Sequence, residues 1–152
     1  ADHVTVAATA QGDSGQKDMA VITTTAVALP VYGVALSNAQ SGSGTAGRQI
    51  DYSMTVTNTG SVVDTIDLRL DGNRWPTELA TQSAEVAGGG SEIVVVTVLI
   101  PASARAGDRD QVTIVATSRN DPDKHDSTVL TTISHVSRDN VYLPLVITDR
   151  SH

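Results

Sequence analysis

The clearest candidates for a ligand-binding site in this sequence are three aspartates in one short segment, Asp121, Asp123 and Asp126. Oxygen-rich loops of this kind can bind calcium, which takes about six to eight oxygen ligands. The run Asn-Asp-Pro-Asp that holds the first two is also ordinary turn chemistry, because Asn and Asp side chains hydrogen-bond to the backbone of turns. We favour the turn, keep calcium as the weaker hypothesis, and expect no other cofactor.

Catalytic arrangements of other kinds are missing from the sequence. Its four histidines, His3, His125, His135 and His152, are widely separated, and the chain has no cysteine. There is no His-x-x-x-His spacing for zinc and no Gly-x-Ser-x-Gly motif for a nucleophilic serine. We therefore expect no catalytic residue and no enzymatic activity.

The single tryptophan, Trp75, is the remaining candidate for ligand binding. An exposed indole ring could stack on a sugar, which makes a cell-surface glycan a candidate partner. A lone Trp followed by a proline, here Pro76, more often fills the core at the end of a strand. We favour a core position for Trp75.

Charge and composition restrict the function and the fold class. The net charge of -7 argues against binding to nucleic acid or to anionic membranes. The longest apolar run, Ile93 to Ile100, is too short for a membrane span. Phe is absent and aromatic residues make up 3% of the chain, so the core must be built from β-branched and small side chains, which favour strands. The sequence predicts an all-β protein.

Alternating segments predict where the strands lie. Residues 49–57 place Ile50, Tyr52, Met54 and Val56 on one face, and residues 63–70 and 92–100 also read as strands. We expect the glycine-rich run 39–47 to be a loop. About seven strands separated by turns predict an Ig-like, Greek-key β-sandwich over residues 31–134.

An internal repeat organises the chain. Residues 1–25 align without a gap on residues 109–133, a segment that reads as a β-hairpin, and ten of the 25 aligned positions are identical. We expect the first copy to be a hairpin with strands at 2–10 and 19–29, joined by residues 11–18. The repeated turn has Gly15 in place of Asp123, so a shared calcium site would lack one ligand there. The identical pairs are Asp2/Asp110, Val4/Val112, Thr5/Thr113, Ala8/Ala116, Thr9/Thr117, Asp13/Asp121, Asp18/Asp126, Val21/Val129, Thr23/Thr131 and Thr24/Thr132.

The motifs Asn58-Thr59-Gly60, Trp75-Pro76 and IPASARAG at residues 100–107, together with VTIVATSRNDP, resemble Ig-like modules related to the NEW3, CARDB and DUF11 families. Modules of these families occur in tandem on secreted and cell-surface proteins of bacteria and archaea. The resemblance covers about residues 31–134, together with the partial copy at residues 1–25. It implies an extracellular, non-catalytic module.

We expect three parts: a partial-repeat hairpin at 1–30 acting as an assembly segment, the sandwich at 31–134, and a linker with a C-terminal docking strand at 135–152. An isolated hairpin is marginal in water, so the first part needs a partner. The tail also has alternating apolar residues that need cover. The predicted assembly residues are Val4, Val6, Ala8, Val21, Thr23, Val141, Leu143, Leu145 and Ile147.

Two functions fit these observations. In the first, the protein is an extracellular structural subunit that assembles head-to-tail by strand addition into a fibre, pilus-like filament, stalk or surface layer, as a homo-oligomer or polymer. In the alternative, it is a non-catalytic accessory or carbohydrate-binding module at the C-terminal end of a larger secreted hydrolase. A first residue other than Met fits either a mature product or a fragment, and we expect an extracellular or cell-surface location.

Overall fold

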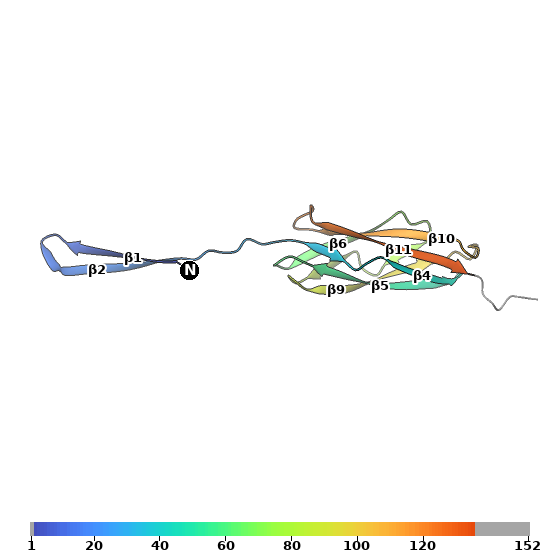
Figure 1. Cartoon of the computed structure of the whole chain (residues 1–152), viewed down its shortest axis with the longest axis horizontal. Helices are drawn as coiled ribbons and strands as arrows, with labels where there is room; N and C mark the ends of the chain where they lie inside the picture. Colours follow the sequence, from blue (N-terminus) through green and yellow to red (C-terminus); the bar gives the residue numbers. More distant parts are fainter. Residues whose placement is uncertain (1, 136–152) are drawn as a thin grey trace, which may run out of the picture. The chain divides into compact units, whose positions relative to one another are not determined.

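The computed structural model describes residues 2–135, which contain eleven strands and no helix (Figure 1). Within this range, therefore, no helix is long and apolar enough to cross a membrane. The chain divides into two compact units, of which the first ends at Pro30 and the second begins at Val31. The first unit contains β1 (Asp2–Ala10) and β2 (Asp13–Thr24); the second contains β3 (Val34–Leu36), β4 (Gln40–Thr45), β5 (Gln49–Asn58), β6 (Asp64–Asp71), β7 (Thr77–Leu79), β8 (Ser83–Val86), β9 (Ser91–Leu99), β10 (Arg109–Ser118) and β11 (His125–His135).

The second unit is a sandwich of two sheets. One sheet has the strand order β3-β5-β9-β7 and the other has the order β4-β11-β10-β6-β8. All pairs are antiparallel except β11 with β4, which run parallel. The predicted all-β, Ig-like β-sandwich is confirmed.

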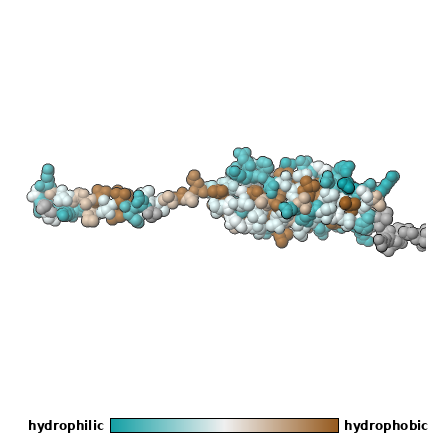
Figure 2. Space-filling model, in the orientation of Figure 1, coloured by the Kyte–Doolittle hydropathy of each residue, from teal (hydrophilic) through white to brown (hydrophobic). Residues whose placement is uncertain are grey.

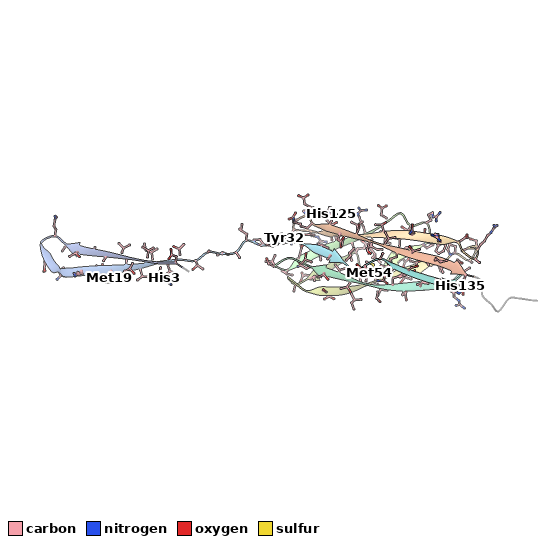
Figure 3. The ribbon with its side chains drawn as sticks, in the orientation of Figure 1. His3, Met19, Tyr32, Met54, His125 and His135 are labelled. Carbon is pink, nitrogen blue, oxygen red and sulfur yellow. The ribbon has the colours of Figure 1, made fainter. Side chains whose placement is uncertain are left out.

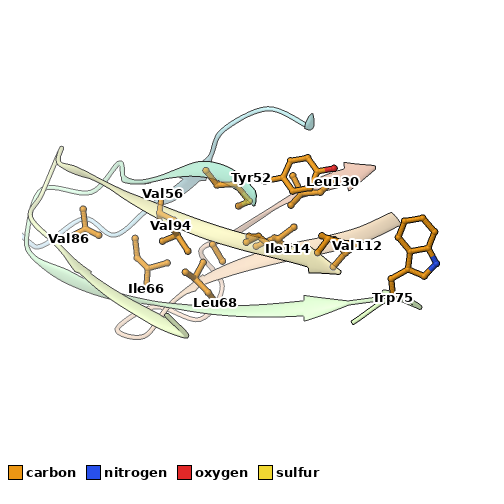
Figure 4. Packing of buried hydrophobic residues seen from close by; sticks show 14 of the residues in the cluster. Tyr52, Val56, Ile66, Leu68, Trp75, Val86, Val94, Val112, Ile114 and Leu130 are labelled. Carbon is orange, nitrogen blue, oxygen red and sulfur yellow. The ribbon is translucent and has the colours of Figure 1, made fainter. Parts of the chain in front are cut away.

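The core lies between the two sheets and is built largely from aliphatic side chains (Figure 4). Strand β5 illustrates the pattern, because Tyr52, Met54 and Val56 are buried while Asp51 and Ser53 are exposed. This alternation follows from the two-residue period of a strand with one covered face. The buried hydrophobic residues are Tyr52, Met54, Val56, Ile66, Leu68, Trp75, Val86, Val94, Val96, Val98, Ile100, Val112, Ile114, Ala116 and Leu130.

The glycine-rich run at 39–47 was expected to be a loop, and this expectation is wrong. It contains the edge strand β4, which pairs with β11. A Cβ on Gly42 would lie 2.8 Å from the Tyr52 hydroxyl oxygen, and one on Gly44 would lie 2.9 Å from Ile50 Cδ1. The glycines therefore let this strand lie directly against core side chains. With β4, the sandwich has nine strands, β3 to β11, instead of about seven.

The first unit is an antiparallel hairpin, as the repeat predicts, although its turn is shorter. Strand β2 begins at Asp13, so only Gln11 and Gly12 separate the two strands. The register repeats that of β10 and β11: Val4 pairs with Ile22 as Val112 pairs with Leu130. A one-residue slip would turn every side chain to the other face. The repeat in sequence is therefore also a repeat in register.

Candidate functional site

The hairpin of β1 and β2 carries one apolar face, which we call the hairpin face. Its members are Val4, Val6 and Ala8 on β1 and Ala20 and Ile22 on β2, because directly paired residues point to the same side. Val4, Val6 and Ile22 are 52%, 50% and 56% exposed. Figure 2 shows hydrophobic residues gathered along part of the hairpin.

The predicted assembly residues do not all belong to this face. Val21 pairs with Thr5 and Thr23 pairs with His3, so these residues lie on the opposite side of the hairpin. The Thr23 hydroxyl lies 3.1 Å from His3 Nδ1. Val141, Leu143, Leu145 and Ile147 lie outside the described residues. Ala20 and Ile22 were missed, although the alignment of Ile22 with Leu130 was a signal for the second.

In the second copy of the hairpin, β10 with β11, the corresponding face is buried in the sandwich core. We call this copy the closing hairpin. Its residues Val112, Ile114 and Leu130, the counterparts of Val4, Val6 and Ile22, are at most 2% exposed. Strand β6 flanks β10, and β4 flanks β11. The hairpin face thus has the residue pattern of a sandwich core, with the side chains half exposed.

Polar side chains also attach the closing hairpin to the rest of the sandwich. The side chain of Asp110, which is 3% exposed, accepts hydrogen bonds from the backbone N–H of Arg74 at 3.1 Å and of Trp75 at 2.9 Å. Trp75 is itself 9% exposed and belongs to the core cluster, so the favoured core position is confirmed (Figure 4). The counterpart of Asp110 in the first unit is Asp2.

Two further attachments lie on β11. The Asp126 carboxylate accepts a hydrogen bond from the Leu36 N–H at 2.8 Å, and the Thr132 hydroxyl lies 2.7 Å from the Tyr52 hydroxyl. Their counterparts in the first unit are identical residues, Asp18 and Thr24. These three polar attachments of the closing hairpin are therefore retained as residue types in the hairpin of β1 and β2, as Asp2, Asp18 and Thr24.

The tip of the closing hairpin is not retained. Ser118 donates to the buried Asp64, and Asn120 donates to the same carboxylate at 2.8 Å. Arg119 forms an ion pair with Asp67 in which the hydrogen bond from the guanidinium lowers the pKa of that carboxyl. The first unit has Ala10, Gln11 and Gly12 at the positions of Ser118, Arg119 and Asn120.

Two of the three candidate calcium ligands, Asp121 and Asp126, accept hydrogen bonds through their carboxylates. Asp121 Oδ1 accepts from the Asp123 N–H at 3.3 Å, and the Asp121 carbonyl accepts from Lys124, as expected of a turn. Asp126 accepts from Leu36 and Ser127. Within residues 2–135 no group of three His, Cys, Asp or Glu side chains is arranged to hold a metal ion. Calcium binding stays a prediction of the sequence.

Removing divalent metal with a chelator is expected to change the melting temperature of the sandwich by less than about 2 °C, because the side chains of the acidic turn, Asp121, Asp123 and Asp126, are not arranged to share a metal ion within the described residues. Thermal melts with and without EDTA measure this. A fall of many degrees that calcium reverses, and that Asp123→Asn abolishes, would instead establish a calcium site at the acidic turn.

Other features of the described chain give no direct support to catalysis. His125 and His135 stand at opposite ends of β11 (Figure 3). Trp75 is too buried to offer an open ring face to a sugar. The expected lack of enzymatic activity stays a prediction.

Comparisons with known proteins support the fold alone. No family model and no curated protein matches the chain. Among solved structures, it is similar to PapD-like domain 7 of human CEP192 (13% identity, TM-score 0.54, covering 77% of this chain and 95% of that one). It is also similar to a family 123 glycoside hydrolase from Clostridium perfringens (9%, 0.56, covering 70% and 28%) and to the E. coli chaperone DraB (10%, 0.50, covering 70% and 56%).

At these identities the likeness does not extend to function. The resemblance to the NEW3, CARDB and DUF11 families stays a prediction. The comparisons support an Ig-like β-sandwich fold, which is similar to that of PapD-like domains.

Proposed function

We propose that this protein is a non-enzymatic structural subunit that assembles head-to-tail by strand addition with modules of its own kind, in an extracellular fibre, filament, stalk or surface layer. One observation carries the proposal. The hairpin of β1 and β2 has the register of the closing hairpin, yet its core-type side chains are half exposed. A segment with the pattern of a sheet interior needs a second sheet or a neighbouring strand as cover.

Covering the hairpin face favours association. Full burial of an exposed Val or Ile side chain stabilises by about 1.5 to 3 kcal/mol. Val4, Val6 and Ile22 are about half exposed, so covering the rest of them offers roughly 2 to 5 kcal/mol before the cost of ordering the partner. Open edges of β1 and β2 add backbone hydrogen bonds, which is the usual source of affinity in strand addition.

The extracellular location rests on the resemblance of the NTG, WP and IPASARAG motifs to modules of secreted proteins. The alternative, an accessory or carbohydrate-binding module of a secreted hydrolase, receives no support from Trp75, which was its strongest residue and lies in the core.

Deleting residues 1–30 is expected to abolish self-association while leaving the sandwich folded, because no strand of the sandwich comes from this segment. The full chain should show a mass that rises with concentration in light scattering, and the deletion variant should stay a monomer. Its melting temperature should change by less than about 2 °C. Unchanged assembly of the deletion variant, seen by scattering and electron microscopy, would rule out the proposal.

A matched pair of double variants tests whether association depends on the hairpin face or on the hairpin in general. Val4 pairs with Ile22 on the hairpin face, whereas Thr5 pairs with Val21 on the opposite face. The double variant Val4→Asp and Ile22→Asp should lose association. The double variant Thr5→Asp and Val21→Asp adds the same charge on the same two strands and should retain most of it.

A further inference from the structure

We propose that the partner of the hairpin face is the open body of another module of this type, a sandwich of strands equivalent to β3–β9 in which the place of β10 and β11 is empty. We call this partner the acceptor body. The inference rests on the proposed function and names the surface to which the hairpin adds. In this chain that surface is already occupied by the closing hairpin. Between copies of this chain the hairpin must therefore displace the neighbour's closing hairpin, whereas a body whose slot is open accepts it directly.

The backbone of the closing hairpin defines how a hairpin sits in the slot. Ser118 donates its N–H to the carbonyl oxygen of Lys124, within the closing hairpin, and Arg119 donates its N–H to the carbonyl oxygen of Thr65 in β6. Because successive strand residues point their N–H groups to opposite sides, the odd-numbered residues of β10 face β6. At the same register, the N–H groups of Thr5, Ala7 and Thr9 face β6 of the acceptor body.

The apolar contacts follow from the same register. Ile114 and Ala116 pair with Leu70 and Leu68 of β6, and both point into the core. Val6 and Ala8 take these two positions in the first unit. The acceptor body would thus flank the hairpin with β6 and β4 and cover the hairpin face with the inner face of the opposite sheet.

Polar residues make the fit selective for such a body. A carboxylate brought beside a buried apolar face is costly unless donors meet it. Asp2 would meet the backbone N–H groups of Arg74 and Trp75 of the acceptor body, as Asp110 does in this chain. Asp18 would meet the N–H of Leu36. Thr24 would meet the hydroxyl of Tyr52. A flat apolar surface offers no such donors, whereas a body like residues 31–108 offers all of them.

The tip of the hairpin indicates how the natural acceptor differs from this chain's own body. Asp64 is buried and is satisfied by Ser118 and Asn120, whose counterparts are Ala10 and Gly12. Ala10 and Gly12 have no side-chain donor for that carboxylate. We expect the natural acceptor body to carry an uncharged residue at the position of Asp64. If it carries an aspartate there, Ala10→Ser on the hairpin should tighten binding, because the serine hydroxyl can donate to that carboxylate.

A fused chain tests the fit. A second copy of residues 31–108 is placed before the full chain, so that its Asp108 is joined to Ala1 at the peptide bond equivalent to Asp108–Arg109. The amides of Thr5, Ala7 and Thr9 should then exchange with solvent about 100-fold more slowly than in the full chain, because they now bond to β6 of the added body. Both Trp75 residues should show the emission of buried indole.

Variants of the fused chain test the recognition itself. Asp2→Ala should reduce the protection of these amides by about tenfold, because the loop at Arg74 and Trp75 loses its acceptor. Asp13→Ala removes the same charge from the turn and should leave the protection nearly unchanged. Ala10→Ser, or Asp64→Ala in the added body, should increase it.

The proposal is overturned if the three amides exchange as fast in the fused chain, and in its Asp64→Ala version, as they do in the full chain. This failure is distinct from failure of the proposed function. Assembly that disappears on deletion of residues 1–30 would then mean that the hairpin adds to an outer sheet edge instead of filling a slot. Slow exchange in the fused chain together with a full chain that never associates would uphold the acceptor body and remove self-assembly.

Discussion

Replacing Asn58 by Asp is expected to lower the melting temperature of the sandwich by about 16 to 32 °C. The Asn58 side chain is fully buried, and its Nδ2 donates to the carbonyl oxygens of Val62 at 2.8 Å and Val86 at 2.9 Å. A carboxylate would instead put negative charge against two carbonyl oxygens. Leaving buried polar groups unpaired beside an uncompensated charge costs about 4 kcal/mol, and each kcal/mol lowers the melting temperature by about 4 to 8 °C.

Asn73→Asp is the matched control. This substitution makes the same change of amide to carboxylate at an exposed residue, where water can replace the hydrogen bond from Asn73 to the Trp75 carbonyl oxygen. Its melting temperature should fall by less than about 8 °C. Equal losses for the two variants in thermal melts would mean that Asn58 does not hold this corner of the sandwich.

The role of Asn58 also explains the Asn-Thr-Gly motif. Asn58 Oδ1 accepts the Gly60 N–H at 2.8 Å, so the side chain closes its own turn as well as bridging to Val62 and Val86. A Cβ at Gly60 would lie 2.2 Å from the Val31 carbonyl oxygen. The motif that suggested a family resemblance therefore has a physical reason in this fold: the asparagine and glycine let three chain segments meet at one corner.

Features carried by side-chain periodicity could be predicted from the sequence. The alternation of Tyr52, Met54 and Val56 identified strand β5 and its buried face. The repeat identified the first hairpin and its pairing, because any slip in register would expose the wrong residues. Strand β4 could not be found in this way, since glycine has no side chain to alternate. Its strand conformation depends on β11, which is distant in sequence.

The candidate site was only partly predictable for a related reason. Val4 and Val6 stand out by alternation, but assigning Val21 to the same face required the register, which places Ile22 there instead. The roles that we propose for Asp2 and Asp18 were not visible in the sequence. Their counterparts Asp110 and Asp126 are held by the N–H groups of Trp75 and Leu36, which lie far away along the chain. Local patterns carry no information about such partners.

Asp110→Ala is expected to lower the melting temperature of the sandwich by about 12 to 24 °C and to move the emission of Trp75 toward that of exposed indole. The buried carboxylate holds the backbone of Arg74 and Trp75 against β10, at 3.1 Å and 2.9 Å. Losing hydrogen bonds to a charged, buried acceptor costs about 3 kcal/mol, at about 4 to 8 °C for each kcal/mol. Trp75 is the only tryptophan, so its fluorescence reports directly on this end of the core.

The control for this variant is the equivalent substitution in the repeated hairpin. Asp2→Ala makes the same substitution at the equivalent position of the first hairpin, and Asp2 is exposed and belongs to a separate unit. In the full chain it should leave both the melting temperature of the sandwich and the emission of Trp75 unchanged. If the sandwich tolerates Asp110→Ala as well as it tolerates Asp2→Ala, the buried carboxylate does not hold the Arg74–Trp75 loop. The same result would remove the reason to expect Asp2 to recognise that loop in another module.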